Sequence, residues 1–146
     1  MATRDTTGTA GGTPRKMSEI MIVTKNELGA LSRITTPLAK NHINISCFTG
    51  YEWGGEAAFR LVTDNNKKAC DVLRTAGYNV QENPVVLWNT ENKPGHLLGA
   101  TTALAEANIN TFCSYSTTSA GAPTCVVAFN TSDTDRTIDV LKRVRF

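Results

Sequence analysis

Two segments of the chain repeat one pattern at a constant spacing, and this duplication limits the possible folds more than any other feature. The segments read KNELGALSRITTPLAKNHINIS, from Lys25, and ENKPGHLLGATTALAEANINTF, from Glu91. Matched residues lie 66 positions apart, as Gly29 and Gly95 do. A constant offset over such a length indicates an internal repeat. We therefore expect the 146 residues to contain two similar units of roughly 65 residues, a size at which a single core is only marginally stable.

Each unit is expected to run strand, helix, strand, strand, helix, strand. In the first unit, a run of apolar residues with high β propensity predicts a strand at 18–25, and apolar residues at helical spacing predict a helix from 29 to about 41. A hairpin turn is predicted at Gly54 and Gly55, and a second helix that ends at Gly77 follows it. The segment YNVQEN then predicts the last strand of the unit. The second unit is expected to repeat this order with strands at 85–89, 109–117 and 124–130 and helices at 95–107 and 133–144.

This order predicts an α+β fold of two tandem ferredoxin-like βαββαβ domains, 17–83 and 84–146, each an antiparallel sheet with helices on one face. The offset grows to 68 between Asp71 and Asp139, which predicts two extra residues in the loop before the last helix. Phe146 aligns with Tyr78, so we expect the second domain to lack most of its last strand. Because proteins usually cover such an edge, and because each domain is small, we expect a homodimer.

Composition excludes several other classes of protein. Residues 1–16 are rich in Thr and Gly and poor in large apolar side chains, which predicts a disordered tail without the apolar region of an export signal. The net charge of +2 argues against a nucleic-acid-binding surface. No apolar run approaches the ~20 residues of a membrane span.

The four cysteines show no close spacing of the CxxC type, so we expect reduced thiols in a cytoplasmic protein. Cys47 and Cys113 are expected to be small buried hydrophobes. The two histidines have no matched carboxylates, and no candidate nucleophile has a base nearby. We therefore expect no metal, no cofactor and no catalysis.

The loop between the first strand and the first helix of each unit is the candidate site. Gly29 and Gly95 permit unusual backbone angles and close approach of another group. The first N–H groups of a helix are unsatisfied and carry partial positive charge, so such a loop suits a carboxylate. In the alternative interpretation, the glycine only forms a tight turn and Asn26 or Asn92 caps the helix.

The second shared feature is an Ile-Asn pair, with Asn44 and Asn110 where the chain leaves a helix and enters a strand. Asn tolerates the left-handed turn that this junction often needs. The full pattern is Asn-x-x-Gly-x-Leu, helix, Ile-Asn, strand, twice in tandem. It resembles the ACT domain family of small-molecule-binding regulatory modules, from Ile20 to the end of the chain. NKPGHL matches the family's Pro-Gly-x-Leu turn, whereas the first copy has Leu28 in place of the proline.

The resemblance implies that the two domains join their sheets and hold a free amino acid, or a similar small carboxylate, between them. The residues that it places at the ligand are Asn26, Leu28, Gly29, Ala30, Leu31, Asn44, Asn92, Pro94, Gly95, His96, Leu97 and Asn110. It implies a non-catalytic regulatory protein that controls a metabolic enzyme or a regulator. The alternative is a scaffold for protein interaction or oligomerisation that binds no ligand.

Two groups of side chains leave their roles open. His96, directly after Gly95, could reach a ligand or lie solvated in the first turn of its helix, and His42 is expected at the surface. Tyr51, Trp53 and Phe59 cluster at the first hairpin, where packing in the core or at a partner interface is favoured over a stacking platform.

Overall fold

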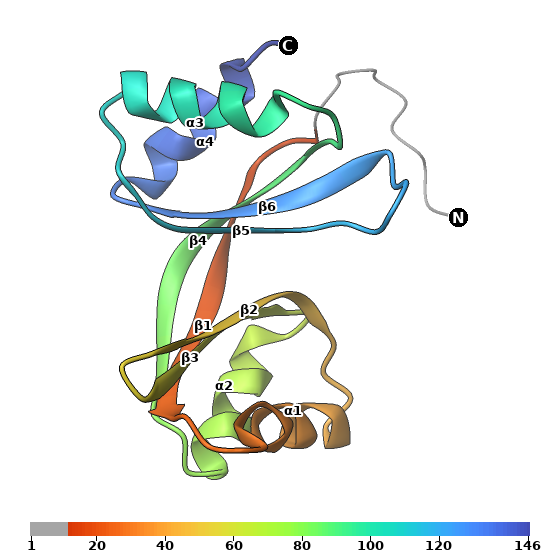
Figure 1. The fold of residues 1–146 in the computed structure, drawn as a ribbon, viewed down its shortest axis with the longest axis vertical. Coiled ribbons are helices and arrows are strands. Elements are labelled where there is room, and N and C mark those ends of the chain that lie inside the picture. The colour runs from red at the N-terminus through yellow and green to blue at the C-terminus, as the bar shows by residue number, and fades with distance from the viewer. Residues whose placement is uncertain (1–11) are drawn as a thin grey trace.

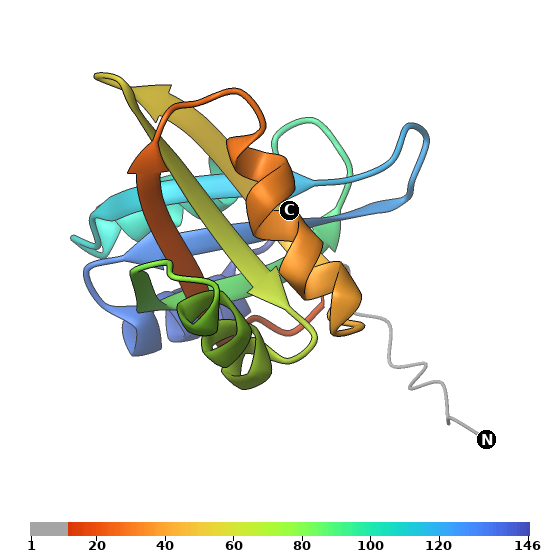
Figure 2. The ribbon, with the colours of Figure 1, turned by 90° about the horizontal axis from the view of Figure 1, so that it is seen from below.

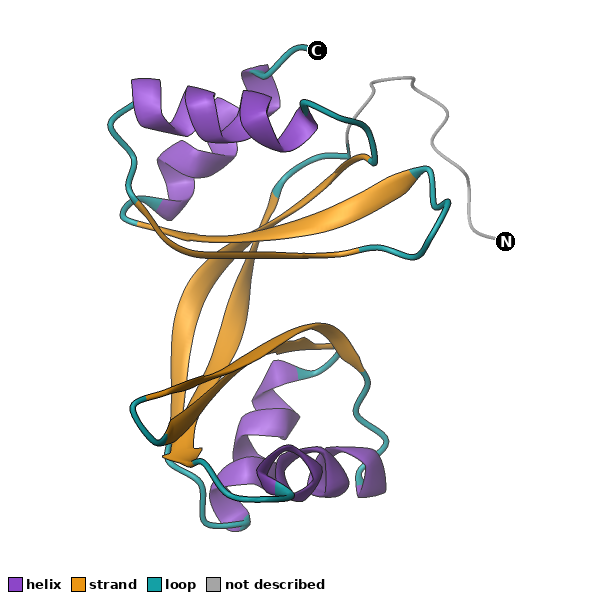
Figure 3. Cartoon of the chain, in the orientation of Figure 1, coloured by secondary structure: helices purple, strands orange, loops and turns teal. Residues whose placement is uncertain are grey.

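The structure is a computed structural model that describes residues 12–146. Its elements are β1 (Arg15–Lys25), α1 (Ala30–Lys40), β2 (Ile45–Trp53), β3 (Glu56–Thr63), α2 (Asn66–Thr75), β4 (Val80–Glu91), α3 (His96–Glu106), β5 (Thr111–Thr117), β6 (Thr124–Thr131) and α4 (Thr134–Arg143). The helices lie on the outer sides and the strands between them (Figure 3). This arrangement confirms the α+β class and the two ferredoxin-like units. None of the helices in this part of the chain combines the length and apolar character of a membrane span.

All six strands form one antiparallel sheet in the order β2-β3-β1-β4-β6-β5. The sequence predicted a last strand for the first unit and a separate first strand for the second, but both belong to the single strand β4. The domain boundary expected between 83 and 84 therefore falls inside a strand. Pro84 has no backbone N–H to donate. It is tolerated there because β4 pairs with β6 only from Val86 onward, so no hydrogen bond to β6 is lost at this position.

The strand β1 is also shared between the two halves. Its first residues pair with the second half of β4, as Arg15 does with Leu87 and Met17 with Val85. They occupy the place of the last strand that the second unit lacks, so the expected open edge is covered within the chain. The homodimer stays a prediction, but this reason for it is removed.

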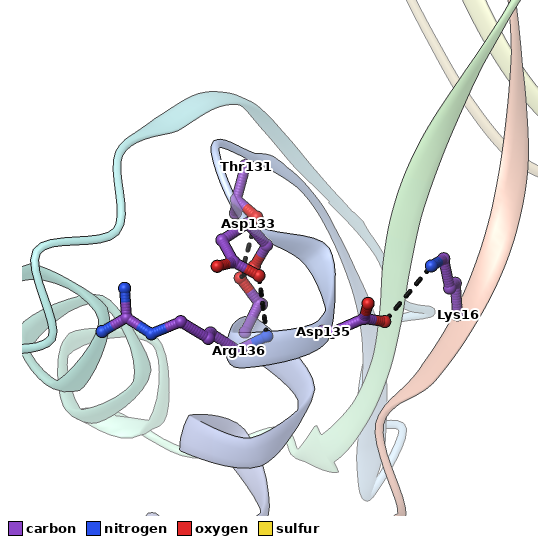
Figure 4. Close-up of polar contacts among 6 residues, drawn as sticks. Lys16, Thr131, Asp133, Asp135 and Arg136 are labelled. Carbon is purple, nitrogen blue, oxygen red and sulfur yellow. Dashed lines mark hydrogen bonds and ion pairs between the residues drawn. The ribbon is translucent and has the colours of Figure 1, made fainter.

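The expected tail is therefore wrong for its last residues. Arg15 and Lys16 belong to β1, and Pro14 is buried. Lys16 Nζ forms an ion pair with Asp135 Oδ1 of α4 at 3.2 Å (Figure 4). The start of β1 is thus tied to both the sheet and a helix of the second unit. Residues 1–11 lie outside the described part of the chain.

The two extra residues of the second unit lie elsewhere than predicted. Ile20 pairs with Leu61 in the first half, and Val86 pairs with Phe129 in the second, so β6 already carries the offset of 68. The insertion therefore lengthens the turn between β5 and β6 rather than the loop before α4. This difference matters for the candidate site, because that turn lies beside the α3 loop.

Three apolar clusters hold the fold together. One lies between α1, α2 and the first half of the sheet, and a second lies between α3, α4 and the second half. The third joins the two halves, because the helix-free faces of the two hairpins and of β4 pack together through Cys47, Val62, Val85, Leu87 and Ala128. The β2–β3 and β5–β6 hairpins face each other across the β1–β4 ribbon and cross rather than run side by side (Figures 1 and 2).

A polar group lies within this contact between the halves. Glu19 of β1 is fully buried and accepts hydrogen bonds from Arg60 Nη1 of β3 at 2.5 Å and from the Tyr115 hydroxyl of β5 at 2.7 Å. Burial and the neighbouring Glu19 raise the pKa of Tyr115. The corresponding residues of the second half are Val85 and Ala128, so only one half contributes this ion pair.

The cysteines are free thiols, with Cys47 buried as predicted and Cys113 half-buried. Burial, reinforced by the neighbouring Glu82 carboxylate, raises the pKa of the Cys70 thiol to about 11. An unfolded thiol has a pKa of about 8.5, so the folded state holds its proton more tightly than the unfolded state does.

We therefore expect the urea midpoint to stay constant up to about pH 8.5 and to fall as the pH rises toward 11. The direction follows because the unfolded chain loses the Cys70 proton first, which favours unfolding at high pH. Urea titrations at several pH values, with Cys70→Ala as the control, measure this effect. A variant that loses stability as steeply as the wild type between these limits would contradict it.

Candidate functional site

The helices α1 and α3 begin in the same unusual way. Gly29 and Gly95 occupy the position before each helix with φ of 82° and 90°, in the left-handed region, and no side chain caps either helix within residues 12–146. In contrast, the Asn65 side chain caps α2 by accepting from Lys68 N. The Asp133 side chain caps α4 by accepting from Arg136 N (Figure 4). Among the four helices of residues 12–146, only the two that follow the repeated loops lack side-chain caps.

The uncapped starts leave backbone donors free. The N–H groups of Leu31 and Ser32, and those of Leu97 and Leu98, have no acceptor in the described part of the chain. Neither first turn contains an acidic residue. These N–H groups carry the positive end of the helix dipole, so each start is complementary to an anion of carboxylate size.

The asparagines of the loops do not act as caps, so the alternative interpretation is wrong on this point, whereas the positive φ of both glycines agrees with the tight turn that it expected. Asn26 N donates to Gly55 O at 3.0 Å, and Asn92 N donates to Pro123 O at 2.9 Å. The Asn92 side-chain amide also donates to Ala122 O at 3.1 Å. In both halves the asparagine therefore ties the loop to the neighbouring hairpin turn and sets the direction in which the helix begins.

A cation lies beside the first loop that the sequence reasoning did not select. Arg33 Nη1 donates to Leu28 O at 3.1 Å, and its guanidinium also pairs with Glu27. Leu28 is fully exposed, whereas Ala30 is buried and faces the core. The helical spacing from Gly29 to Arg33 was the signal that could have identified this residue, because residues four apart lie on one face of a helix.

The second loop lies beside an open hollow of about 600 Å³, a size typical of small-molecule sites. The lengthened β5–β6 turn forms its other wall, and the lining residues are Glu91, Asn92, Lys93, Gly121, Ala122, Pro123 and Thr124. Lys93 forms an ion pair with Glu91, and its hydrogen bond lowers the pKa of that carboxyl. Pro94 is exposed, and a Cβ on Gly95 would have no heavy atom within 4 Å. Both charge signs and open space thus adjoin the start of α3.

His96 does not lie solvated in the first turn, so that expectation is wrong. Its ring is buried, and its Nδ1 is 2.9 Å from the Thr90 hydroxyl. The Phe146 ring stacks on it with ring centroids 3.9 Å apart. His96 therefore supports the start of α3 from within the core, whereas Leu31 and Leu97 remain partly exposed beside the loops.

Asn44 and Asn110 do not occupy the left-handed turns that the sequence suggested. Those positions belong to His42 and Asn108, both with φ of 56°. The backbone N–H of Asn44 donates to the Asp64 carboxylate, as that of Asn110 does to the Ser132 hydroxyl. Both asparagines lie beyond the far end of an 11-residue helix, roughly 16 Å along its axis from the loop. The structure therefore does not bring them to the loops.

The two loops also lie far from each other. Each follows the carboxyl end of a shared strand, and β1 and β4 are antiparallel, so the loops lie at opposite ends of the ribbon, roughly 45 Å apart along extended strands. The expectation of one ligand held by both loops of one chain is therefore wrong. A single chain presents two separate candidate sites.

Comparisons with known proteins agree with this architecture. Residues 16–146 match the model of the ACT domain pair, and the chain belongs to this family. Protein BT0572 from Bacteroides thetaiotaomicron superposes with a TM-score of 0.81 and 25% identity over 90% of both chains.

Two structures of lower identity share the fold. The ligand-free regulatory subunit of aspartate kinase from Thermus thermophilus has a TM-score of 0.65 and 13% identity, over 94% of this chain and 100% of that one. The corresponding subunit from Thermus flavus has a TM-score of 0.62 and 12% identity, over 92% and 98%. The comparison with curated proteins found no significant match.

Proposed function

We propose that this chain is a non-catalytic regulatory module that binds a free amino acid, or a similar small carboxylate, at the start of α3. The observation that carries the proposal is the contrast between uncapped α1 and α3 and capped α2 and α4. At α2 and α4 a side-chain oxygen already lies at the first turn and accepts one of its N–H groups, whereas the first turns of α1 and α3 have no such oxygen and are open to an external anion. Membership of the ACT domain pair supports a regulatory, ligand-binding role.

The second loop is favoured over the first for two reasons. The hollow of about 600 Å³ adjoins it, whereas the guanidinium of Arg33 lies 3.5 Å from the position of a Cβ at Gly29 and crowds the first loop. The ion pair of Glu91 and Lys93 also places one charge of each sign beside the loop, and a ligand with an ammonium and a carboxylate is complementary to both. In this proposal the carboxylate lies on the N–H groups of Leu97 and Leu98.

A thermal-shift screen against the twenty amino acids tests the proposal. A ligand at about a hundred times its dissociation constant stabilises the folded state by about 2.7 kcal/mol, which raises the melting temperature of a chain this size by several degrees. Gly95→Val should abolish that shift, because the branched side chain fills the open space before the free N–H groups.

The matched control is Gly77→Val. Gly77 also has a positive φ, 94°, and a Cβ there also meets no atom within 4 Å, but it lies at the end of α2, away from both loops. Both variants should lose about 1–3 kcal/mol through backbone strain, and only Gly77→Val should keep the ligand response. If no amino acid shifts the melting curve, or if both variants respond equally, the scaffold alternative replaces this proposal.

A further inference from the structure

One sheet face of the first half carries an exposed apolar patch. On the side of the sheet without helices, Val23 of β1, Ala58 of β3 and Tyr51 of β2 form one cross-strand row. Trp53 lies at the end of β2 in the next row and is 81% exposed, and Val23 and Tyr51 are each more than two-fifths exposed. Ala58, between Val23 and Tyr51, is itself buried, and we call the three exposed residues Val23, Tyr51 and Trp53 the β2 patch.

The duplicated chain supplies an internal comparison for this patch. At the positions of the second half that correspond to Val23, Tyr51 and Trp53, the chain has Asn89, Thr117 and Ser119. The same surface of the same fold is therefore polar in one half and apolar in the other. The fold itself does not require apolar residues here, so the difference needs another cause, and a large exposed aromatic patch marks an interaction site.

The β2 patch continues an interface that the chain already uses. Two rows further along the same strands, Cys47 and Val62 lie on the same face and pack against the sheet of the second half. This face of the first half thus already packs on the sheet of the second half, which covers only part of it. The patch is the uncovered part.

Charge at the rim indicates what covers the patch. In the last row Glu56 lies beside Trp53, and Lys25 lies on the far side of Glu56. The two have opposite sign and both are exposed, and Lys25 also forms an ion pair with Glu27 of its own chain. A nucleic acid or an anionic membrane would require a basic rim. A rim with both signs lets a second copy pair its lysine with the carboxylate of the first. Each copy has one such patch, because the second half lacks it. The contact therefore uses the same surface on both copies, and the closed assembly contains two chains.

We propose that two copies of this chain associate through the β2 patch, face to face, as a symmetric dimer. The proposal goes beyond ligand binding, because it identifies a surface remote from the start of α3. It also gives a new physical reason for a dimer, in place of the open sheet edge that the chain itself covers.

Sedimentation of the full chain between about 1 and 100 μM tests the proposal, a range in which specific dimers of moderate affinity form. The triple variant Val23→Asn, Tyr51→Thr and Trp53→Ser copies the second half, so it introduces only residues that the fold already accepts. We expect the wild type to be a dimer and the variant to dissociate at least about a hundredfold more readily, with unchanged circular dichroism. The control, Phe112→Ser and Leu98→Ala, removes exposed apolar groups of the second half and should leave the dimer intact.

Tryptophan emission gives an independent measurement. Trp88 is buried, so a red shift of the wild-type emission on dilution reports Trp53 as it becomes exposed, and Trp53→Ser should lose this shift. A wild type that is monomeric over the whole concentration range would overturn the proposal and indicate that the patch binds a different macromolecule. A triple variant that dimerises like the wild type, or a control that dissociates instead, overturns it as well.

Discussion

Glu19→Ala is expected to lower the free energy of unfolding by about 3–5 kcal/mol, the largest single effect that the structure predicts. The fully buried Glu19 carboxylate accepts from Arg60 and from Tyr115, and these three side chains come from β1, β3 and β5. Without the carboxylate, the guanidinium of Arg60 stays largely buried with no counter-charge, and the Tyr115 hydroxyl loses its acceptor. Urea unfolding of the two proteins measures the loss.

The second half of the chain supplies the control for this prediction. It has Val85 and Ala128 at the positions of Glu19 and Arg60, so the double variant Glu19→Val and Arg60→Ala copies a contact that the fold already contains. Because no unpaired charge is left, this variant should be more stable than Glu19→Ala. A double variant less stable than the single one would show that Arg60 stabilises the fold in another way.

Removal of residues 12–17 is expected to be the second most damaging change. These residues complete the sheet of the second half, and Pro14 is buried and Met17 half-buried against the contact between the halves. At about 1.5–3 kcal/mol for a fully buried apolar side chain, the loss should be about 3 kcal/mol. The melting temperature should fall by roughly 10 °C relative to a chain that begins at Gly12.

The sequence alone suggested the opposite result, that deletion of everything before Met17 leaves the stability unchanged. Melting curves of chains that begin at Gly12, at Met17 and at Ser18 decide between the two, because the expectation from the sequence concerns only the residues before Met17. Equal melting temperatures would show that the first residues of β1 contribute nothing to the sheet. Because the deletion also uncovers Val85 and Leu87, we expect the shorter chain to bind hydrophobic dyes more strongly as well.

The repeat allowed the order and class of the elements to be predicted, because apolar periodicity and turn residues are local signals. It also located both glycine loops, whose positive φ the structure confirms. What the sequence could not show is which strands are shared. The sequence of β4 predicts two strands because Pro84 interrupts it. The strand is continuous because β1, about sixty residues earlier in the chain, pairs with it on both sides of Pro84.

The candidate site was predicted less well than the fold, for a related reason. Whether His96 is buried depends on Thr90 and on Phe146, which lies fifty residues later. Whether Asn92 caps its helix depends on Ala122, in a turn whose insertion was placed in the wrong loop. Such roles are set by contacts between distant segments, which local spacing does not contain.

A titration of the ¹⁵N-labelled chain with the amino acid that gives the largest thermal shift tests the central claim most directly. The backbone amides of Leu97 and Leu98 should shift in a saturable way, because the ligand carboxylate accepts from these N–H groups. The amides of Lys68 and Arg136, in the capped first turns of α2 and α4, serve as the internal reference and should stay unchanged. Saturable shifts confined to other parts of the chain, or no saturable shift with any amino acid, would contradict the account.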